Sequence, residues 1–269
     1  MSASVLACGR FQLDLSRPLI MGILNVTPDS FSDGGSYLDA SQALARAEQM
    51  IAQGADIIDI GGESTRPGAL EVSVQQELDR VMPVLEGVLA LQVPVSVDTR
   101  KSEVMRAVLA AGADMVNDVG ALEDEGALAV VAASSAAVCL MHKQGNPDAM
   151  QSAPKYVDVV AEVDDYLLER AMLAESAGIA RNRIMIDPGF GFGKTLEHNI
   201  QLLRKLADLA ERGLPVLVGL SRSPCWGPSP ETPWIADSLK VWRQPCWLSS
   251  EVRWWCGYTT LNRPKMQSR

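Results

Sequence analysis

Between Leu19 and Leu220 the sequence alternates short apolar runs with amphipathic stretches, and this alternation limits the fold more than any other feature. Each apolar run has the length and continuous hydrophobicity of a strand that is buried on both faces. The expected strands span residues 19–24, 56–60, 94–97, 115–117, 137–141, 184–186 and 216–220. Seven strands separated by helices predict a parallel sheet, which right-handed crossovers can close into a (β/α)8 TIM barrel.

The stretches between these runs carry helical patterns. The expected helices span residues 41–53, 74–88, 102–111 and 157–177. Ser41 is expected to cap the first helix and Gly54 to stop it, and the second tolerates Pro83 within a regular apolar stripe. An open doubly wound sheet is the alternative architecture, but no GxGxxG pattern follows the first strand.

Polar residues stand where each expected strand ends. They are Asn25, Glu63, Ser64, Thr65, Arg66, Asp98, Asn117, Asp118, His142, Asp187, Ser221 and Arg222. In a barrel the carboxyl ends of all strands meet at one face, so these side chains are predicted to form one site. Asp98 and Asp187 could instead cap the helices that follow them, because Asp is a common N-cap residue. A lone His142 is more typical of packing or hydrogen bonding than of catalysis.

The polar residues suggest a ligand for this face. Asn25 offers a neutral oxygen that suits Mg²⁺ held mainly by phosphate and water. Arg66, in the loop 61–68, suits a phosphate, although a solvated surface arginine is an equal alternative.

The two aspartates narrow the choice of ligand. The Asp98 and Asp187 carboxylates can each accept paired N–H groups, such as those of a pterin or guanine ring, and Asn117 can add a bond to the ring. Phe192, between glycines, could lie against a flat ligand or simply pack.

Composition and motifs exclude several classes of protein. The formal charge of -9 opposes general nucleic-acid binding, and no apolar run is long enough to span a bilayer. Five cysteines without a CxxC motif fit a reducing compartment, so we expect a cytoplasmic protein. With two histidines, no evident triad and no HExxH pattern, a triad or zinc hydrolase is not expected.

Seven motifs, in their order and spacing, resemble those of the dihydropteroate synthase family, the sulfonamide-inhibited enzymes of the folate pathway. They are MGILNVTPDSFSDGG, GGESTRPGA, SVDT, NDV, LMHKQGNP, DPGFGFGK and VGLSR. The resemblance runs from near the start of the chain through Arg222 and implies a (β/α)8 barrel. It also implies condensation of 6-hydroxymethyl-7,8-dihydropterin diphosphate with 4-aminobenzoate, giving 7,8-dihydropteroate and diphosphate, with sulfonamides as competitors.

The resemblance also assigns roles to single residues. Asn25 matches the family's magnesium position, which makes Mg²⁺ the implied cofactor. The residues that match the pterin-binding groups are Asp98, Asn117 and Asp187. The residues that match the diphosphate loop are Thr65 and Arg66, and those around the aminobenzoate are Phe31, Pro67, Phe192 and Ser221. In the family the carbon–oxygen bond to diphosphate breaks largely ahead of amine attack, so orientation and charge neutralisation replace a classical acid or base.

The resemblance stops at Arg222. The family continues with a lysine in SRKSMLG and a last strand ending in RVHD, whereas this chain reads SRSPCWG. Ser-Pro-Cys-Trp-Gly can be encoded as AGT CCA TGC TGG GG, which becomes AAG TCC ATG CTG GGG, encoding Lys-Ser-Met-Leu-Gly, when one A is restored in front. In the same shifted frame, residues 256–261 can encode Arg-Val-His-Asp-Val. We infer a single-base deletion, in the gene or in its sequencing, which divides the chain into a barrel domain (1–222) and an aberrant tail (223–269).

The tail has predicted consequences. Ser223 stands where the family has the lysine that contacts pterin and aminobenzoate, and the arginine and histidine at the diphosphate are absent. Without an eighth strand, the first and seventh strands are expected to keep exposed edges, so this chain should be unstable and poorly active. A family-like homodimer is in doubt for the same reason. Two alternative functions are pterin-dependent methyl transfer, and pterin or sulfonamide binding without turnover.

Overall fold

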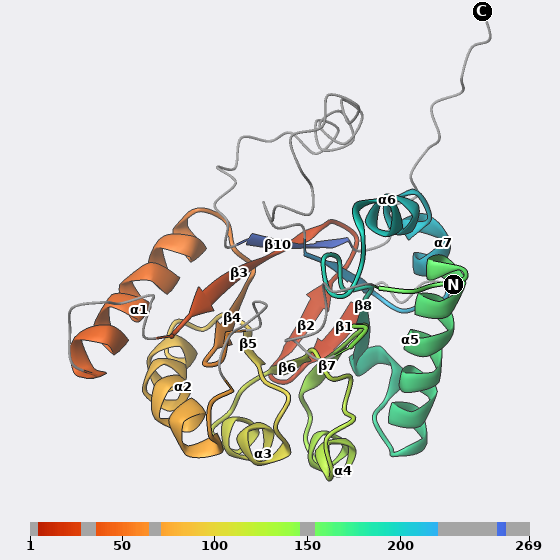
Figure 1. The fold of residues 1–269 in the computed structure, drawn as a ribbon. Coiled ribbons are helices and arrows are strands. Elements are labelled where there is room, and N and C mark those ends of the chain that lie inside the picture. Colours follow the sequence, from red (N-terminus) through yellow and green to blue (C-terminus); the bar gives the residue numbers. More distant parts are fainter. Residues whose placement is uncertain (1–4, 28–35, 65–70, 146–153, 220–251, 257–269) are drawn as a thin grey trace, which may run out of the picture.

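The computed structural model describes residues 5–27, 36–64, 71–145, 154–219 and 252–256, and within them a closed eight-stranded barrel (Figure 1). The barrel strands in spatial order are β10 (Val252–Cys256), β3 (Leu19–Asn25), β4 (Ile57–Gly61), β5 (Val95–Asp98), β6 (Met115–Asp118), β7 (Ala137–Met141), β8 (Ile184–Asp187) and β9 (Val216–Val218). Strands β3 to β9 pair in parallel with their neighbours. All seven strands predicted from apolar runs are confirmed, and so is the barrel.

Helices surround the barrel. They are α1 (Ser36–Ala52), α2 (Val74–Leu89), α3 (Ser102–Ala110), α4 (Ala127–Ala132), α5 (Val159–Ser176), α6 (Leu196–Arg204) and α7 (Leu206–Ala210), with a 3-10 turn η2 (Arg181–Arg183). The prediction that Ser41 caps the first helix is wrong, because α1 already begins at Ser36, directly after a pair of glycines that interrupts helical sequence. The other three predicted helices are confirmed to within two residues at each end.

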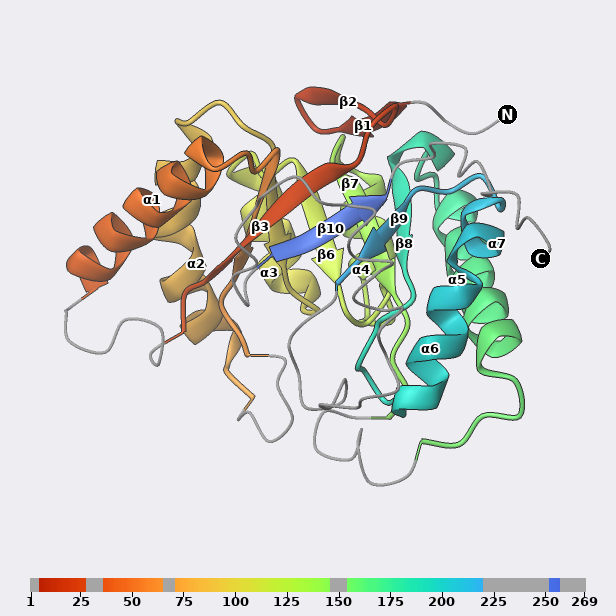
Figure 2. The ribbon, with the colours of Figure 1, turned by 90° about the horizontal axis from the view of Figure 1, so that it is seen from above.

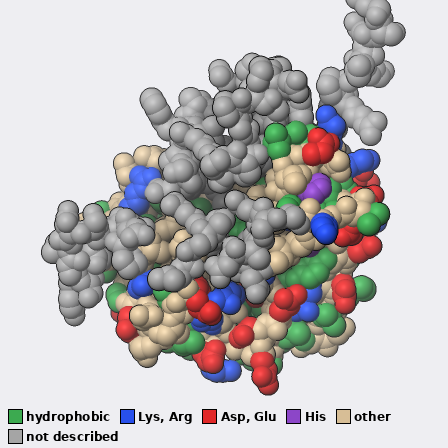
Figure 3. Space-filling model, viewed as in Figure 1, with side chains coloured by type: hydrophobic (Ala, Val, Ile, Leu, Met, Phe, Trp, Pro, Cys, Tyr) green, Lys and Arg blue, Asp and Glu red, His purple; other side chains and the backbone are tan. Residues whose placement is uncertain are grey.

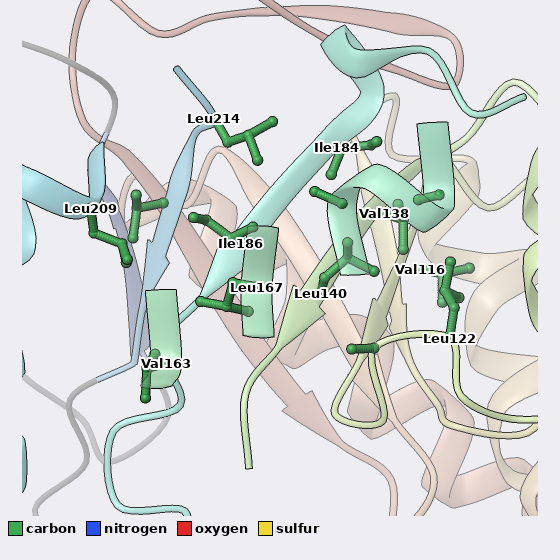
Figure 4. Close-up of a cluster of buried hydrophobic side chains, with 14 of the residues drawn as sticks. Val116, Leu122, Val138, Leu140, Val163, Leu167, Ile184, Ile186, Leu209 and Leu214 are labelled. Carbon is green, nitrogen blue, oxygen red and sulfur yellow. The ribbon is translucent and has the colours of Figure 1, made fainter. Parts of the chain in front are cut away.

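Two kinds of apolar core hold these layers together. The outward strand faces pack against the helices, as Figure 4 shows for Val138, Leu140 and Ile186 beside Leu167 of α5. The inward faces form a separate core that includes Met21, Ile57, Met115, Cys139, Met185 and Leu217. Because side chains alternate along a strand, this core places Asp59, Asn117 and Asp187, two residues further along their strands, on the inner face as well.

An N-terminal hairpin closes the barrel at the end opposite the strand carboxyl ends, and the sequence patterns had not indicated it (Figure 2). Its strands are β1 (Val5–Cys8) and β2 (Phe11–Asp14), and Leu6 and Cys8 are fully buried in the inner core. Arg10 binds Asp114, which directly precedes β6, through Nε–Oδ1 and Nη2–Oδ2 contacts of 3.0 and 2.8 Å. The hairpin therefore plugs the barrel without approaching the predicted site.

The eighth strand differs from expectation in its origin and its direction. β10 comes from the segment after Arg222 and pairs antiparallel with both β3 and β9. The expectation that these two strands keep exposed edges is therefore wrong. The physical reason is that open edges offer unpaired backbone donors and acceptors, and VRWWC is rich in residues that favour strands.

Candidate active site

Four of the described polar residues of the predicted site, Asn25, Asp98, Asn117 and Asp187, lie at the carboxyl ends of barrel strands. Asn25, Asp98 and Asp187 are the last residues of β3, β5 and β8, and Asn117 is the penultimate residue of β6. The register pairs Asn25 with Gly61, Gly61 with Asp98, and Asp98 with Asn117. Asn25, Asp98 and Asn117 are therefore at one level across four neighbouring strands.

Gly61 is the point where the Asn25 and Asp98 side chains approach each other. A Cβ atom placed on Gly61 would lie 3.3 Å from Asn25 Oδ1 and 3.8 Å from Asp98 Cβ. The side-chain oxygen of Asn25 therefore lies over Gly61 of β4. The absence of a side chain at Gly61 leaves this part of the barrel mouth open to a ligand.

Neither aspartate caps a helix, so the structural alternative for these residues is wrong. The helix after β5 has Lys101 at its N-cap, and the Ser102 amide donates to Asp124 rather than to Asp98. The helix after β8 is capped by the Thr195 side chain.

Asp187 is nonetheless held in place. It is 2% exposed, and its Oδ1 accepts a 2.7 Å hydrogen bond from the Gly189 amide. The carboxylate at the end of β8 is thus buried at the barrel mouth with one oxygen fixed by the following turn.

Asn117 is oriented by a residue one layer deeper. Its Nδ2 donates to Asp59 Oδ2 at 3.1 Å, and both residues are essentially fully buried. Asn117 Oδ1 and Asp59 Oδ1 have no hydrogen-bond partner among the described residues, and neither has the neighbouring Ser96 hydroxyl. The inner wall formed by β4, β5 and β6 therefore holds unsatisfied polar atoms just below the barrel mouth.

The loop after β8 lies against the loop after β7. A Cβ on Gly189 would lie 1.9 Å from the His142 carbonyl oxygen, and one on Gly193 would lie 2.4 Å from that of Gln144. Both glycines also have positive φ, at 65° and 63°, which other residues adopt only with strain. Half-buried Phe192 is carried by this loop, and its amide donates to the Gly189 carbonyl at 3.1 Å.

The loop after β4 begins on a network of buried charges. Lys101 Nζ contacts Glu63 Oε2 and Glu77 Oε2, each at 2.6 Å, and Glu77 is fully buried. Burial opposes ionisation of Glu63, but the bond and the charge of Lys101 outweigh it and lower the pKa of that carboxyl. Six predicted site residues lie outside the described residues, namely Phe31, Thr65, Arg66, Pro67, Ser221 and Arg222.

The described surface carries charges of both signs. On the face shown in Figure 3, acidic and basic side chains are intermixed around the described part of the molecule. Among the described residues, no group of three or more His, Cys, Asp and Glu side chains could hold a metal ion. No helix in the part of the chain that the structure describes is long and apolar enough to cross a membrane.

Comparison with known proteins identifies the family. The sequence profile of the pterin binding enzymes matches residues 21–233, most of the chain and all of the strands that carry the site. The chain belongs to the pterin-binding enzyme family.

Individual family members are similar over most of their length. The dihydropteroate synthase of Escherichia coli strain K12 is 55% identical over 211 residues, which are 78% of this chain and 75% of that protein. The dihydropteroate synthase of Neisseria meningitidis serogroup C is 55% identical over 226 residues, covering 82% and 80% of the two chains. A solved Xanthomonas albilineans dihydropteroate synthase with 4-aminobenzoic acid superposes with a TM-score of 0.77 at 53% identity, over 84% of this chain and 80% of that one.

In this pterin-binding enzyme, sequence reasoning missed Lys194, which is 6% exposed and joins the two loops beyond β7 and β8. Its Nζ lies 2.9 Å from the Gly189 carbonyl oxygen, 3.1 Å from that of Phe192 and 3.0 Å from His142 Nδ1. The only sequence feature that could have indicated a role for Lys194 is its position at the end of the DPGFGFGK motif. Lys194 therefore ties the Phe192 loop to the strand end that carries His142.

Electrostatics at Lys194 and His142 follow from burial. Burial lowers the pKa of Lys194 to about 7, and the charge of Asp187 opposes this. Burial, and then the charge of Lys194, lower the pKa of His142 to about 3, so its imidazole is neutral. His142 thus acts as a buried hydrogen-bonding residue, as the sequence reasoning expected.

Proposed function

We propose that this chain is a dihydropteroate synthase, a transferase that condenses 6-hydroxymethyl-7,8-dihydropterin diphosphate with 4-aminobenzoate. The observation that carries this proposal is the placement of Asp98, Asn117 and Asp187 at one barrel mouth, in a chain 55% identical to the Escherichia coli enzyme. These two carboxylates and one carboxamide are complementary to the N–H groups of an aminopterin ring. The comparisons favour this reaction over methyl transfer, since the similar proteins carry the synthase name.

Asp187 and Asp98 hold the ring in this proposal, and no side chain needs to move a proton at the reacting carbon. The Gly189 amide fixes Oδ1 of Asp187 and so sets the orientation of the carboxylate that is proposed to face the ring. Phe192 packs beside the site of the aromatic amine, on a loop that Lys194 anchors. The reaction then depends more on holding the two substrates in line than on an acid or a base. Correct orientation of the two substrates can by itself remove a large part of the activation barrier.

Mg²⁺ fits the residues of the mouth. Asn25 Oδ1 extends over Gly61 at the carboxyl end of the strands, and a neutral oxygen suits this ion. With a single protein ligand, the ion would be bound mostly by diphosphate oxygens and water, as Mg²⁺ commonly is. When bound, it would neutralise charge on the departing diphosphate.

The ligands of similar proteins support the choice of partners. Solved dihydropteroate synthases contain 7,8-dihydropteroate in Xanthomonas albilineans and a sulfonamide drug complex in Yersinia pestis. We therefore propose pterin diphosphate and 4-aminobenzoate as substrates and sulfonamides as competitors. A cytoplasmic location and a homodimer are further proposals, the first resting on the cysteine pattern and the second only on the family resemblance.

Ser223 leads us to propose a lower turnover for this chain than for its relatives. It occupies the position where the family resemblance places a lysine, and the diphosphate-contacting arginine and histidine have no counterpart after it. Pterin binding depends on Asp98, Asn117 and Asp187, which precede this point. The chain should therefore still bind pterin, more weakly than relatives that have the lysine, and turn over slowly, which keeps the non-catalytic binding protein as the second candidate function.

Two measurements test the proposal. Calorimetry should show that 6-hydroxymethyl-7,8-dihydropterin binds to the 269-residue chain. Its dissociation constant for the Asp187→Asn variant should be about tenfold higher or more. Diphosphate release with both substrates and Mg²⁺ should be slow for this chain and restored in a version with the frame corrected after Arg222. Absence of pterin binding in both versions would refute the function, whereas equal turnover would refute only the impairment.

A further inference from the structure

The buried pair formed by Asp59 and Asn117 is not explained by the fold. The two residues come from β4 and β6, on either side of β5, and are 1% and 0% exposed. Asn117 Nδ2 donates to Asp59 Oδ2 at 3.1 Å. The remaining oxygen of each side chain has no partner among the described residues, although a buried polar atom left unpaired costs about 1–3 kcal/mol. Such atoms in a native interior call for an explanation, and this end of a (β/α)8 barrel is the end where its active site lies.

The pair fixes the direction of the Asn117 carboxamide. Asp59 Oδ2 accepts the bond from Asn117 Nδ2, so the NH₂ group of the carboxamide faces Asp59. The reversed amide would place its oxygen against the carboxylate, and two acceptors would then repel. Asn117 Oδ1 is therefore the atom left for a bound ligand, and it can only accept.

We propose that Asp59 is a positioning residue that holds the Asn117 oxygen ready to accept an N–H from the pterin ring. The inference rests on the proposed function, because it takes Asn117 as a pterin contact. It adds a residue in a deeper layer than the strand-end residues of the site. It also adds a selection rule, since a ligand that presents a lone pair instead of an N–H to Asn117 Oδ1 would be disfavoured.

A comparison of substitutions at Asp59 tests this role. Asp59→Leu removes the acceptor at similar volume, so the amide can turn, and the dissociation constant of 6-hydroxymethyl-7,8-dihydropterin should rise about five- to twentyfold. Asp59→Asn keeps an oxygen that can face Asn117, so it should change the dissociation constant of the pterin less than about threefold. Ser96→Ala is the matched control, because Ser96 is the β5 neighbour of Asp59, is buried and does not bond Asn117. Its effect should stay within about twofold.

A pair exchange keeps the test decisive if Asp59→Leu does not fold. Asn117→Asp alone sets two buried carboxylates against each other and should weaken binding about tenfold or more. Combining it with Asp59→Asn restores the bond in reverse and still presents an acceptor, so most of the affinity should return. Calorimetry and thermal melting of each 269-residue variant separate lost binding from lost folding.

The outcomes separate the inference from the proposed function. Affinity recovered by the exchange, together with a loss in Asp59→Leu that exceeds the loss in Ser96→Ala, supports the positioning role. A folded Asp59→Leu that binds pterin like the wild type, or an exchange without recovery, overturns it and leaves the function intact. A wild-type chain that does not bind the pterin would instead refute the proposed function itself.

Discussion

Replacing Lys194 by Met should destabilise the protein by an amount that depends strongly on pH. Met keeps the apolar stem of the lysine but removes every donor. The Phe192 carbonyl and His142 Nδ1 then lose their bond to the lysine, at about 1–3 kcal/mol each, while the Gly189 carbonyl keeps the Phe192 amide as a donor. Against this, the wild type must bury an amine whose pKa falls from 10.5 to about 7, and this cost is present whenever the amine is charged.

The sign of the pH dependence follows from the depressed pKa. Between about pH 7 and 10.5 the unfolded chain binds more protons at Lys194 than the folded one, so the free energy of unfolding rises with pH. One pKa unit corresponds to about 1.4 kcal/mol, so two pH units above 7 add about 2–3 kcal/mol to the wild type and nothing to Lys194→Met. The stability difference between the two should therefore be small near pH 6 and larger by that amount near pH 9.

Urea unfolding followed by circular dichroism from pH 6 to 9 measures this difference. Lys205→Met is the matched control, since Lys205 has a side chain that is 58% exposed and its loss should cost no more than about 0.5 kcal/mol at any pH. The difference between wild type and variant isolates Lys194 from other groups that titrate in this range. A difference that stays constant within about 0.5 kcal/mol would show that the surrounding acceptors fully compensate the buried ammonium, and the reasoning would be wrong.

Three further predictions concern stability and closure of the barrel. Asp114→Ala should cost about 1–3 kcal/mol in urea unfolding, because it leaves the buried Val95 amide without its side-chain acceptor, and Arg10→Met should cost at least as much, because it leaves the 1% exposed carboxylate of Asp114 without its cation. Gly189→Ala should lower the melting temperature far more than Gly178→Ala, although both have positive φ, because only Gly189 faces a carbonyl oxygen at 1.9 Å; equal shifts would contradict the close approach. A chain ending at residue 222 loses β10 and opens two strand edges, so light scattering on warming should show earlier aggregation than in the full chain.

Local sequence signals were sufficient for the strands and for the face that carries the site. Parallel strands covered on both sides must be apolar throughout, so each appears as a separate run, and seven runs were found at the observed positions. Asn25, Asp98 and Asp187 were found for the same reason, because a polar residue directly after such a run marks the end of a strand. All three lie at the carboxyl ends of their strands.

Contacts between distant residues could not be predicted in this way. Asn117 and Asp59 are 58 positions apart, and Lys194 and His142 are 52 positions apart. Neither pair has a local pattern, because a buried aspartate or lysine looks in the sequence like any solvated one. The N-terminal hairpin was missed similarly, since its plugging role depends on Asp114, more than 100 positions away from Arg10.

The eighth strand shows that closing a barrel and completing its site are separate requirements. Closure needs only a backbone that can pair on both sides, and β10 provides that although it runs antiparallel. Its first residue, Val252, pairs with Gly22, and Trp255 pairs with Leu19, so the chain enters β10 from the carboxyl ends of the other strands and leaves toward their amino ends. In (β/α)8 barrels the loop that follows the eighth strand helps to bind phosphate at the carboxyl face. Here β10 ends at Cys256 beside Val216, the first residue of β9, so it closes the barrel without bringing its own carboxyl end to that face.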